Sequence, residues 1–363
     1  MQVLELIKPD GRHLTLYSRE PIADVRAAPS PFAEPQRANP HLRWHPLRGE
    51  WVAYAAFRQN RTFQPPPEYN PLAVAVDSAN PTELPAGDYE VAVFDNRFPA
   101  LSLESHDPPQ LSVPTAPAAG HCEVVVFTQD PGAALGKLSL GRIDLLLQVW
   151  GDRTVRQART GRIKYVLPFE NRGAEVGVTL HHPHGQIYGY PFIPPVPARM
   201  LEQEIAYFAQ HGRALLVDFA RGELANESRA LYLGEHAIAF VPACARYPYE
   251  VWVMPLVHVD SFAALSSDQR ADLARALKTT LLKYEGLWQR PFPYLMARYQ
   301  APTDGAPHPE TQLHAQFYPP YRSRDRLKYL AGTELGAGTF AMDALPEEKA
   351  LELQQVVVNL EES

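Results

Sequence analysis

The two halves of this chain repeat the same short sequence patterns in the same order. Three segments of the first half have counterparts roughly 130 residues later: 123–127 and 250–254, 165–167 and 294–296, and 184–188 and 314–318. The last pair reads His-Gly-Gln-Ile-Tyr and His-Ala-Gln-Phe-Tyr. Because three matches in one order at nearly one spacing are hard to obtain by chance, they indicate a duplicated unit. The alternative is two unrelated α+β segments that share common patterns.

The stretch between the first two matches predicts a helix in each half. Apolar residues there follow one helical stripe: Ile143, Leu146, Leu147 and Trp150 in the first half, and Leu273, Leu277, Leu281 and Tyr284 in the second. The second helix is preceded by the Ser-x-x-Gln pattern of a capping box, from Ser266 to Gln269. We expect a further helix around 198–210, with Leu201, Ile205 and Phe208 facing inward.

Each half therefore reads as strand, helix, strand, and then a strand that carries His-x-Gln-aromatic-Tyr. Helices do not separate the strands regularly, as a doubly wound parallel sheet would require. We expect an α+β fold with a mostly antiparallel sheet and helices packed on it. The predicted domains are 1–195, which carries the candidate catalytic motif, and 196–363.

Composition excludes several classes of protein. The chain has 363 residues, and its net charge of −7 argues against a general nucleic-acid binder. No apolar run approaches the length of a membrane span, and Met1–Ile7 is too short and too acidic for a signal peptide. Its two cysteines, Cys122 and Cys244, are far apart and outside any Cys-x-x-Cys pair. We therefore expect a cytoplasmic protein with no membrane partner.

The segment 181–188, His-His-Pro-His-Gly-Gln-Ile-Tyr, contains the most reactive side chains. On an extended backbone His182, His184 and Gln186 lie on one face, so they are expected to point into one site. Imidazole acts near neutral pH as base, nucleophile or metal ligand, and Gly185 would let a bulky charged group approach the backbone. The segment thus indicates a phosphate site or a metal site. The alternatives are an exposed polar strand and a fortuitous metal pair.

A neutral imidazole can attack phosphorus and hold the phosphoryl group covalently, which divides one hard step into two easier ones. Gln186 offers amide donors that do not titrate and could hold a phosphate oxygen.

The motif 182–186 resembles the His-Pro-His-Gly-Gln signature of the galactose-1-phosphate uridylyltransferases. These enzymes are the transferase branch of the histidine-triad superfamily and are built from two histidine-triad-like halves, as the repeat suggests independently. Four other segments support the resemblance: 94–99, 169–173, 313–320 and 328–334. The hydrolase branch of the superfamily has a third His where Gln186 stands, which disfavours a hydrolase.

The resemblance implies roles for individual residues. His184 is similar to the nucleophile that takes up UMP from UDP-glucose, and Gln186 to the residue that holds the transferred phosphoryl group. Residues similar to the nucleotide- and phosphate-binding positions of the family are Arg58, Arg61, Asn96, Phe98, Asn171, Gly177 and Thr179. Lys328, Tyr329 and Glu334 match the sugar-binding segment, which in the family can reach the site of a neighbouring subunit. A homodimer with shared active sites is therefore implied.

The metal sites of the family do not match this chain. Many members hold a structural zinc with a Cys-x-x-Cys pair, a further His and the first His of the signature. The pair aligns with Asn70 and Ala73, and the third ligand position falls in 128–132, which has no histidine. The counterparts of a second, iron-type site are Met200, Asp304, His314 and Gln316. We expect no cofactor and no metal, and hydrogen bonds rather than zinc should hold His182.

The expected reaction is a ping-pong transfer of UMP from UDP-glucose to galactose 1-phosphate, a step of the galactose (Leloir) pathway. A uridylyl-histidine on His184 is the expected intermediate. One alternative is an ADP-sugar phosphorylase or adenylyltransferase of the same fold, and another is an inactive nucleotide-binding paralogue. His314 is either a residual site residue or a packing histidine, and His181 has no assigned role.

Overall fold

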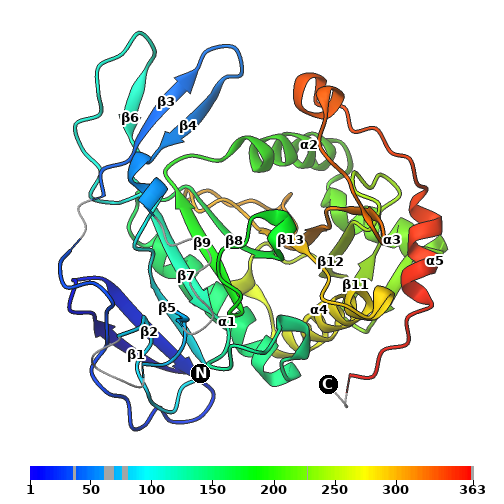
Figure 1. Cartoon of the computed structure of the whole chain (residues 1–363). Helices are drawn as coiled ribbons and strands as arrows, with labels where there is room; N and C mark the ends of the chain where they lie inside the picture. Colours follow the sequence, from blue (N-terminus) through cyan, green and yellow to red (C-terminus); the bar gives the residue numbers. More distant parts are fainter. Residues whose placement is uncertain (36–37, 61–68, 76–80, 227, 361–363) are drawn as a thin grey trace.

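A computed structural model describes residues 1–35, 38–60, 69–75, 81–226 and 228–360 (Figure 1). Within these residues there are five α-helices: α1 (Leu140–Ala158), α2 (Pro195–His211), α3 (Leu215–Asn226), α4 (Ser267–Trp288) and α5 (Pro346–Gln354). The short helical turns are η1 (Ala56–Asn60), η2 (Leu135–Lys137), η3 (Ala174–Val176), η4 (Phe262–Ala264) and the π-type η5 (Thr333–Ala337). None of the described helices is long and apolar enough to cross a membrane.

One sheet of eleven strands runs through both halves of the described chain. In spatial order its strands are β1 (Gln2–Ile7), β2 (His13–Ser18), β5 (Val91–Asp95), β7 (His121–Val126), β9 (His184–Tyr190), β8 (Tyr165–Arg172), β13 (Tyr294–Tyr299), β14 (His314–Tyr318), β12 (Val251–Pro255), β11 (Ala237–Phe240) and β10 (Ala230–Leu233). Neighbouring strands pair antiparallel throughout. The predicted α+β fold with an antiparallel sheet is confirmed.

Two small sheets accompany the large one. The first has the order β4 (Glu50–Tyr54), β3 (His41–His45), β6 (Thr115–Pro117), and the second pairs β15 (Tyr321–Ser323) with β16 (Arg326–Leu327). In Figure 1 the β3–β4 hairpin and α5 lie at opposite sides of the molecule.

The strand order reads almost the same from either end, with the junction of the halves between β8 and β13. In the first half β9 lies between β7 and β8, and in the second β14 lies between β12 and β13. Phe169 of β8 pairs with Ala297 of β13, and these two residues also pair with Gln186 and Gln316 respectively. Phe169 and Ala297 are therefore equivalent positions, and a pseudo-two-fold axis passes between them.

This register corrects the sequence alignment of the repeat by one residue in two strands. Val124 pairs with Gln186 and Trp252 pairs with Gln316, so Val124 corresponds to Trp252, whereas the sequence match equated it with Val251. Likewise Leu167 corresponds to Leu295, whereas the match equated it with Met296. The sequence match was misled because both strands are continuous apolar runs, in which a slip of one residue leaves the pattern intact.

Both predicted repeat helices are confirmed, as α1 and α4. They pack against each other on one face of the sheet, and all eight residues of the two predicted stripes are at most 4% exposed. Ser266 caps α4, with the reciprocal bond from its own backbone to Gln269. A single apolar cluster contains residues of both helices and of strands from both halves, among them Trp150, Ile187 and Phe317. The helix-covered face of the sheet is therefore one continuous core.

The predicted helix around 198–210 is present as α2, but its inward face was partly wrong. Ile205 is 49% exposed, whereas Glu204 is buried. Burial raises the pKa of the Glu204 carboxyl to about 7. Glu204 is therefore buried where the apolar pattern predicted that Ile205 would be.

Candidate active site

Strand β9 carries His184, Gln186 and Tyr188 on the face of the sheet that α1 and α4 leave uncovered. These side chains are half-buried, whereas the alternate residues Gly185 and Ile187 are buried on the helix side. A Cβ at Gly185 would lie 2.7 Å from the Phe169 carbonyl oxygen and 2.9 Å from the Phe127 ring. The expectation that Gly185 admits a ligand is therefore wrong: its missing side chain makes room for Phe127 on the other face of the sheet.

A backbone contact fixes the tautomer of His184. Its Nδ1 lies 2.7 Å from the carbonyl oxygen of His182, and since a carbonyl only accepts, Nδ1 carries the proton. Burial, together with the nearby His182, lowers the pKa of His184. The ring is therefore neutral near pH 7, and Nε2 holds the free lone pair that a nucleophile needs.

Gln186 is oriented by Asn96, which follows β5. The Asn96 amide donates to Gln186 Oε1 at 3.2 Å, and Asn96 Oδ1 accepts from the backbone of Phe98 at 2.9 Å. Because the carbonyl oxygen of Gln186 is engaged, its NH₂ group remains as the donor beside His184. Asn96 thus supports Gln186 in addition to any contact with a nucleotide.

Two clefts meet at His184. The first has a volume of about 160 Å³ and is lined partly by apolar and aromatic side chains, and the second has a volume of about 470 Å³ and is more polar. Candidate site residues along the first are Arg58, Asn96, Phe98, Thr179, His184 and Gln186. Asn171, His182 and His184 line the second, together with Lys137, Arg172 and His181. An imidazole at the junction can contact groups in both clefts.

One wall of the first cleft is aromatic and includes Phe32 and Tyr69, neither of which was predicted from the sequence. Phe32 packs edge-on against Phe98, with ring centroids 6.3 Å apart, and the Arg97 guanidinium lies over the Phe32 ring at 4.3 Å. Both aromatic residues come from irregular proline-rich segments, and no periodic pattern marks them.

Arg58 lies in η1 and is tied to the site by two contacts. One of its terminal nitrogens donates to the Phe98 carbonyl at 2.6 Å and to the Tyr188 hydroxyl at 3.3 Å. It therefore presents a positive charge at the rim of the first cleft. The other predicted arginine, Arg61, lies outside the described residues.

Three predicted phosphate-binding positions lie at or near the end of β8. Asn171 lines the second cleft together with His184, and its Oδ1 is buried without a hydrogen-bond partner among the described residues. Thr179 reaches the first cleft. Gly177 ends η3 in the left-handed conformation, with φ of 78°, and lines neither cleft. Gly177 is thus placed as a turn residue that leads the chain back toward β9.

The predicted sugar-binding residues do not line the clefts of this chain. Tyr329 is 76% exposed, whereas Lys328 and Glu334 are buried against each other, with Nζ 3.6 Å from the carboxylate. Glu334 also accepts from the backbones of Ala331 and Ala341, and these hydrogen bonds lower its pKa. The pair holds a loop, and the structure does not bring that loop to the His184 of the same chain.

The hydrogen bonds expected around His182 are present. Its Nε2 lies 2.7 Å from the Thr128 carbonyl oxygen and is therefore protonated, so Nδ1 accepts from the Asn70 amide at 3.0 Å. Zinc in proteins is held by Cys, His and carboxylate ligands, and an amide with a carbonyl does not form such a set. These residues therefore do not fit the structural zinc of the family.

The second copy of the motif is closed. His314 donates from Nδ1 to the Gln312 carbonyl at 2.8 Å, as His184 does to His182, but its Nε2 accepts from Gln316 at 3.1 Å. Tyr318 donates in turn to Gln316 Oε1. His314 is 4% exposed, and burial lowers its pKa to about 4. The structure therefore assigns His314 a packing role.

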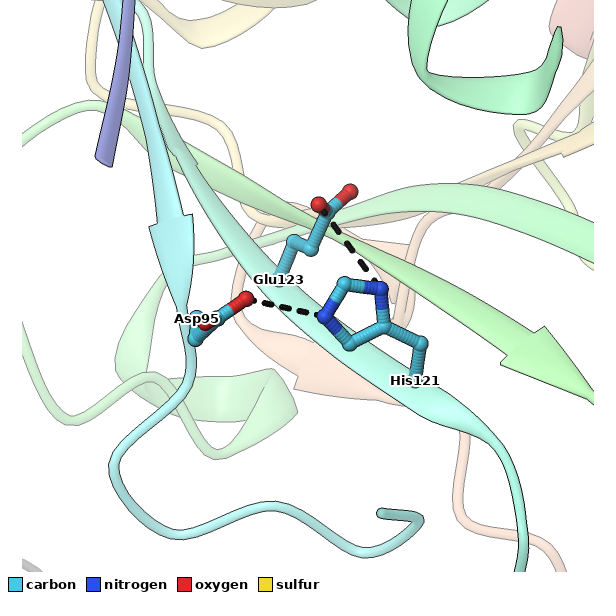
Figure 2. A group of neighbouring side chains, drawn as sticks. All are labelled: Asp95, His121 and Glu123. Carbon is cyan, nitrogen blue, oxygen red and sulfur yellow. Dashed lines mark hydrogen bonds and ion pairs between the residues drawn. The ribbon is translucent and has the colours of Figure 1, made fainter. Parts of the chain in front are cut away.

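Among the described residues, one cluster has the composition of a metal site: Asp95, His121 and Glu123 (Figure 2). His121 Nε2 lies 2.8 Å from Asp95, and its Nδ1 lies 3.9 Å from Glu123. The Glu123 carboxylate, however, is already taken by the guanidinium of Arg153 and by Gln157, which donates at 2.9 Å. A cation would have to displace Arg153, so the cluster is an ion-pair network.

Comparison with known proteins identifies the family. Residues 30–194 match the model described as galactose-1-phosphate uridyl transferase, N-terminal domain, and residues 200–362 match that of the C-terminal domain. The chain belongs to the galactose-1-phosphate uridylyltransferase family. A family enzyme of Thermotoga maritima is 36% identical over 331 residues, which are 88% of this chain and 99% of that protein. One of Rattus norvegicus is 32% identical, covering 92% of this chain and 90% of that protein.

Solved structures agree with this family. A structure described as a uridylyltransferase superposes with a TM-score of 0.77 at 30% identity, covering 89% of this chain and 99% of that one. An ADP-glucose phosphorylase from Arabidopsis thaliana with bound ADP-glucose has a TM-score of 0.66 at 22% identity, over 88% of this chain and all of that one. The second likeness shows that the fold is shared.

Proposed function

We propose that this protein transfers UMP from UDP-glucose to galactose 1-phosphate, with His184 as the covalent carrier. One observation carries the proposal: the His184 Nδ1 proton is held by the His182 carbonyl, so Nε2 is free where the two clefts meet. Membership of a family of uridylyltransferases supports the choice of substrates.

In the first half-reaction His184 Nε2 attacks the phosphorus that bears the uridine. A P–N bond forms, the P–O bond to the glucose phosphate breaks, and glucose 1-phosphate leaves with the electron pair. The ring becomes positively charged while it carries UMP. The His182 carbonyl, which accepts the Nδ1 proton, stabilises that charge because it is already oriented toward the ring.

In the second half-reaction a phosphate oxygen of galactose 1-phosphate attacks the same phosphorus. The P–N bond breaks, its electron pair returns to Nε2, and UDP-galactose is released. The attacking phosphate is ionised at pH 7, so no base has to remove a proton from it. One histidine therefore suffices for both steps.

The neighbours of His184 have complementary roles in this proposal. The Gln186 NH₂ group would hold a nonbridging oxygen of the transferred phosphoryl group, since Asn96 engages its carbonyl oxygen. Arg58 would balance phosphate charge, and Phe98 with Phe32 would pack against the nucleoside. Asn171 and Thr179 would donate to phosphate oxygens.

We further propose a homodimer in which the segment 328–334 of one subunit closes the site of the other. The segment does not line the clefts at His184 in its own chain. It nevertheless exposes apolar side chains, Tyr329 at 76% and Leu330 at 38%, and Leu335 directly after it is 67% exposed. Exposed apolar groups on an ordered loop favour contact with another protein surface.

The proposed location is the cytoplasm. Both cysteines are free thiols, one buried at Cys122 and one exposed at Cys244, which suits a reducing compartment.

The intact mass of the protein after incubation with UDP-glucose tests the reaction. The expected result is a gain of one uridylyl group in the wild type and none in His184→Ala. His314→Ala is the matched control and should still form the adduct, since His314 is enclosed by Gln316. An adduct on His184→Ala, or none on the wild type, would contradict the proposal. ADP-glucose in a parallel reaction distinguishes an adenylyltransferase, which would gain an adenylyl group instead.

A further inference from the structure

Asn70 lies on a turn that is firmly attached to the first half of the sheet. The backbone N–H of Ala73 donates to the Asn70 carbonyl at 3.1 Å, and that of Leu72 donates to Asn70 Oδ1 at 3.0 Å. The turn is tied to the segment 82–84 by a hydrogen bond from the backbone N–H of Glu83 to the Pro71 carbonyl at 2.9 Å. Leu72, 3% exposed, anchors it in an apolar cluster. The side-chain amide of Asn70 is therefore held in place before any ligand binds.

From Asn70 a short series of hydrogen bonds reaches the nucleophile. The Asn70 NH₂ group donates to His182 Nδ1, and His182 Nε2 donates to the Thr128 carbonyl. The imidazole of His182 is thus held between the turn and the end of β7. The carbonyl oxygen of the same residue then accepts the Nδ1 proton of His184 at 2.7 Å. The residue that orients the nucleophile is itself fixed through its side chain.

We propose that Asn70 is a positioning residue for the reaction at His184: by holding the His182 ring, it fixes the backbone carbonyl that orients the His184 imidazole. This inference rests on the proposed function of His184. It goes beyond that function by assigning a role to a turn residue that touches neither the nucleophile nor either reacting group.

The chemistry of the contact explains why an amide is suited to this position. His182 is 2% exposed, and burial lowers its pKa, so the ring is neutral and has one donor and one acceptor. The Nε2 proton of His182 is donated to the Thr128 carbonyl, so the buried Nδ1 needs a hydrogen-bond donor as its partner. The Asn70 NH₂ group is that donor, and the Asn70 side-chain oxygen accepts from the Leu72 backbone within the turn. A carboxylate at position 70 could not satisfy His182 Nδ1, because both groups only accept hydrogen bonds.

The test is Asn70→Ser. A serine oxygen can still accept from Leu72 and preserve the turn, but its side chain is too short to reach His182. We expect kcat to fall on the order of tenfold with KM for UDP-glucose little changed, because the nucleophile is displaced while the binding clefts remain. Asn39→Ser is the matched control, because Asn39 Oδ1 accepts from the backbone N–H of His106 at 3.0 Å in an exposed loop. The kcat of the Asn39→Ser variant should equal that of the wild type.

A second readout follows the His182 ring directly and does not depend on turnover. In protein labelled with ¹⁵N-histidine, wild-type His182 should show one protonated nitrogen, Nε2, and one hydrogen-bonded acceptor, Nδ1. Asn70→Ser should change the Nδ1 signal, whereas Asn39→Ser should not. Wild-type kcat in Asn70→Ser, or an unchanged Nδ1 signal, would overturn the inference. An inactive wild type would instead contradict the proposed function and leave the ¹⁵N comparison to decide about Asn70.

Metal dependence provides an independent check. Wild-type protein treated with a chelator should keep its kcat, because the contacts that hold His182 are hydrogen bonds. A loss of kcat that zinc alone restores would overturn the inference.

Discussion

At the scale of single residues, two histidines with the same backbone contact differ in what their second nitrogen can do. In both His184 and His314 the Nδ1 proton is donated to the carbonyl two residues earlier. The difference comes from the glutamine that follows. Both glutamines are held by their side-chain oxygen, Gln186 by Asn96 and Gln316 by Tyr318, but the NH₂ group of Gln316 donates to His314 Nε2, whereas that of Gln186 makes no such bond to His184 among the described residues. One copy therefore keeps a free nucleophile, and the other is a closed hydrogen-bond network.

Replacing His314 should therefore affect stability and not chemistry. His314→Ala leaves a buried cavity and an unpaired Gln316 amide, so we expect it to lower the free energy of unfolding by about 2–4 kcal/mol. Urea denaturation with an unchanged m-value would measure this loss. Adduct formation with UDP-glucose should persist at temperatures where the variant is folded. A variant of wild-type stability would contradict the packing role.

At the scale of secondary structure elements, the ends of β5 and β7 are joined by an imidazole between two carboxylates. Asp95 and Glu123 are paired across the two strands, and His121 lies between their side chains (Figure 2). Burial opposes protonation of His121, but Glu123 and Asp95 outweigh burial and raise its pKa. Asp95 immediately precedes Asn96, so this network secures the strand end from which Asn96 reaches Gln186.

The raised pKa of His121 predicts how stability depends on pH. A group whose pKa is higher in the folded state stabilises the fold fully below its unfolded pKa, about 6.5, and loses that contribution as pH rises through the folded value. His121→Gln keeps a donor for Asp95 but cannot titrate. The free-energy advantage of the wild type over the variant should therefore be larger near pH 5.5 and should shrink toward pH 9.

Urea denaturation across this pH range measures the difference, with His106→Gln as the control. The His106 ring bonds to the Glu104 carbonyl in an exposed loop and lies outside the network of Asp95, His121 and Glu123, so this variant removes an imidazole without changing that network. A wild-type advantage over His121→Gln that grows with pH would show that the sign of the His121 contribution is wrong.

The sequence was sufficient for elements whose pattern is local, and it failed where tertiary contacts decide. The stripes of α1 and α4 and the Ser266 cap are local, and both helices were predicted correctly. The register of the repeat, by contrast, depends on pairing across strands, and the apolar runs at 123–127 and 250–254 do not specify it. Gly185 was misread because the Phe127 ring reaches it only in the fold. Ile205 was misread because the fold buries its neighbour Glu204 instead, which no local pattern indicates.

For the candidate site, the motif 182–186 located the chemistry but not its surroundings. Alternation along β9 was enough to predict that His184 and Gln186 share a face. Phe32 and the bond from Asn96 to Gln186 join segments of very different sequence position, and nothing local marks either of them. Asn70 was known only as a position without cysteine, and its contact with His182 emerges from the packing of its turn.

At the scale of the whole molecule, the two halves of the duplicated sheet have different proposed roles: the first half carries the nucleophile, and the second half completes the site of a partner subunit. The halves share one core and are joined by the β8–β13 ladder, so each is a fixed platform for its loops. The second half carries β15, β16 and η5, whose side chains do not line the clefts at His184. In the proposed dimer this half completes the partner's site, and each active site then needs residues from two chains.

Mixing two inactive variants tests that arrangement. Glu334→Ala should lose most activity because Glu334 pairs with Lys328 and accepts from two backbone N–H groups of the loop. His184→Ala should be inactive for chemical reasons. After the two are unfolded, mixed in equal amounts and refolded, half of the dimers are mixed, and each mixed dimer has one site with both residues intact. We expect about a quarter of the wild-type activity. If the segment acted within its own chain, no intact site could form and the mixture would stay inactive.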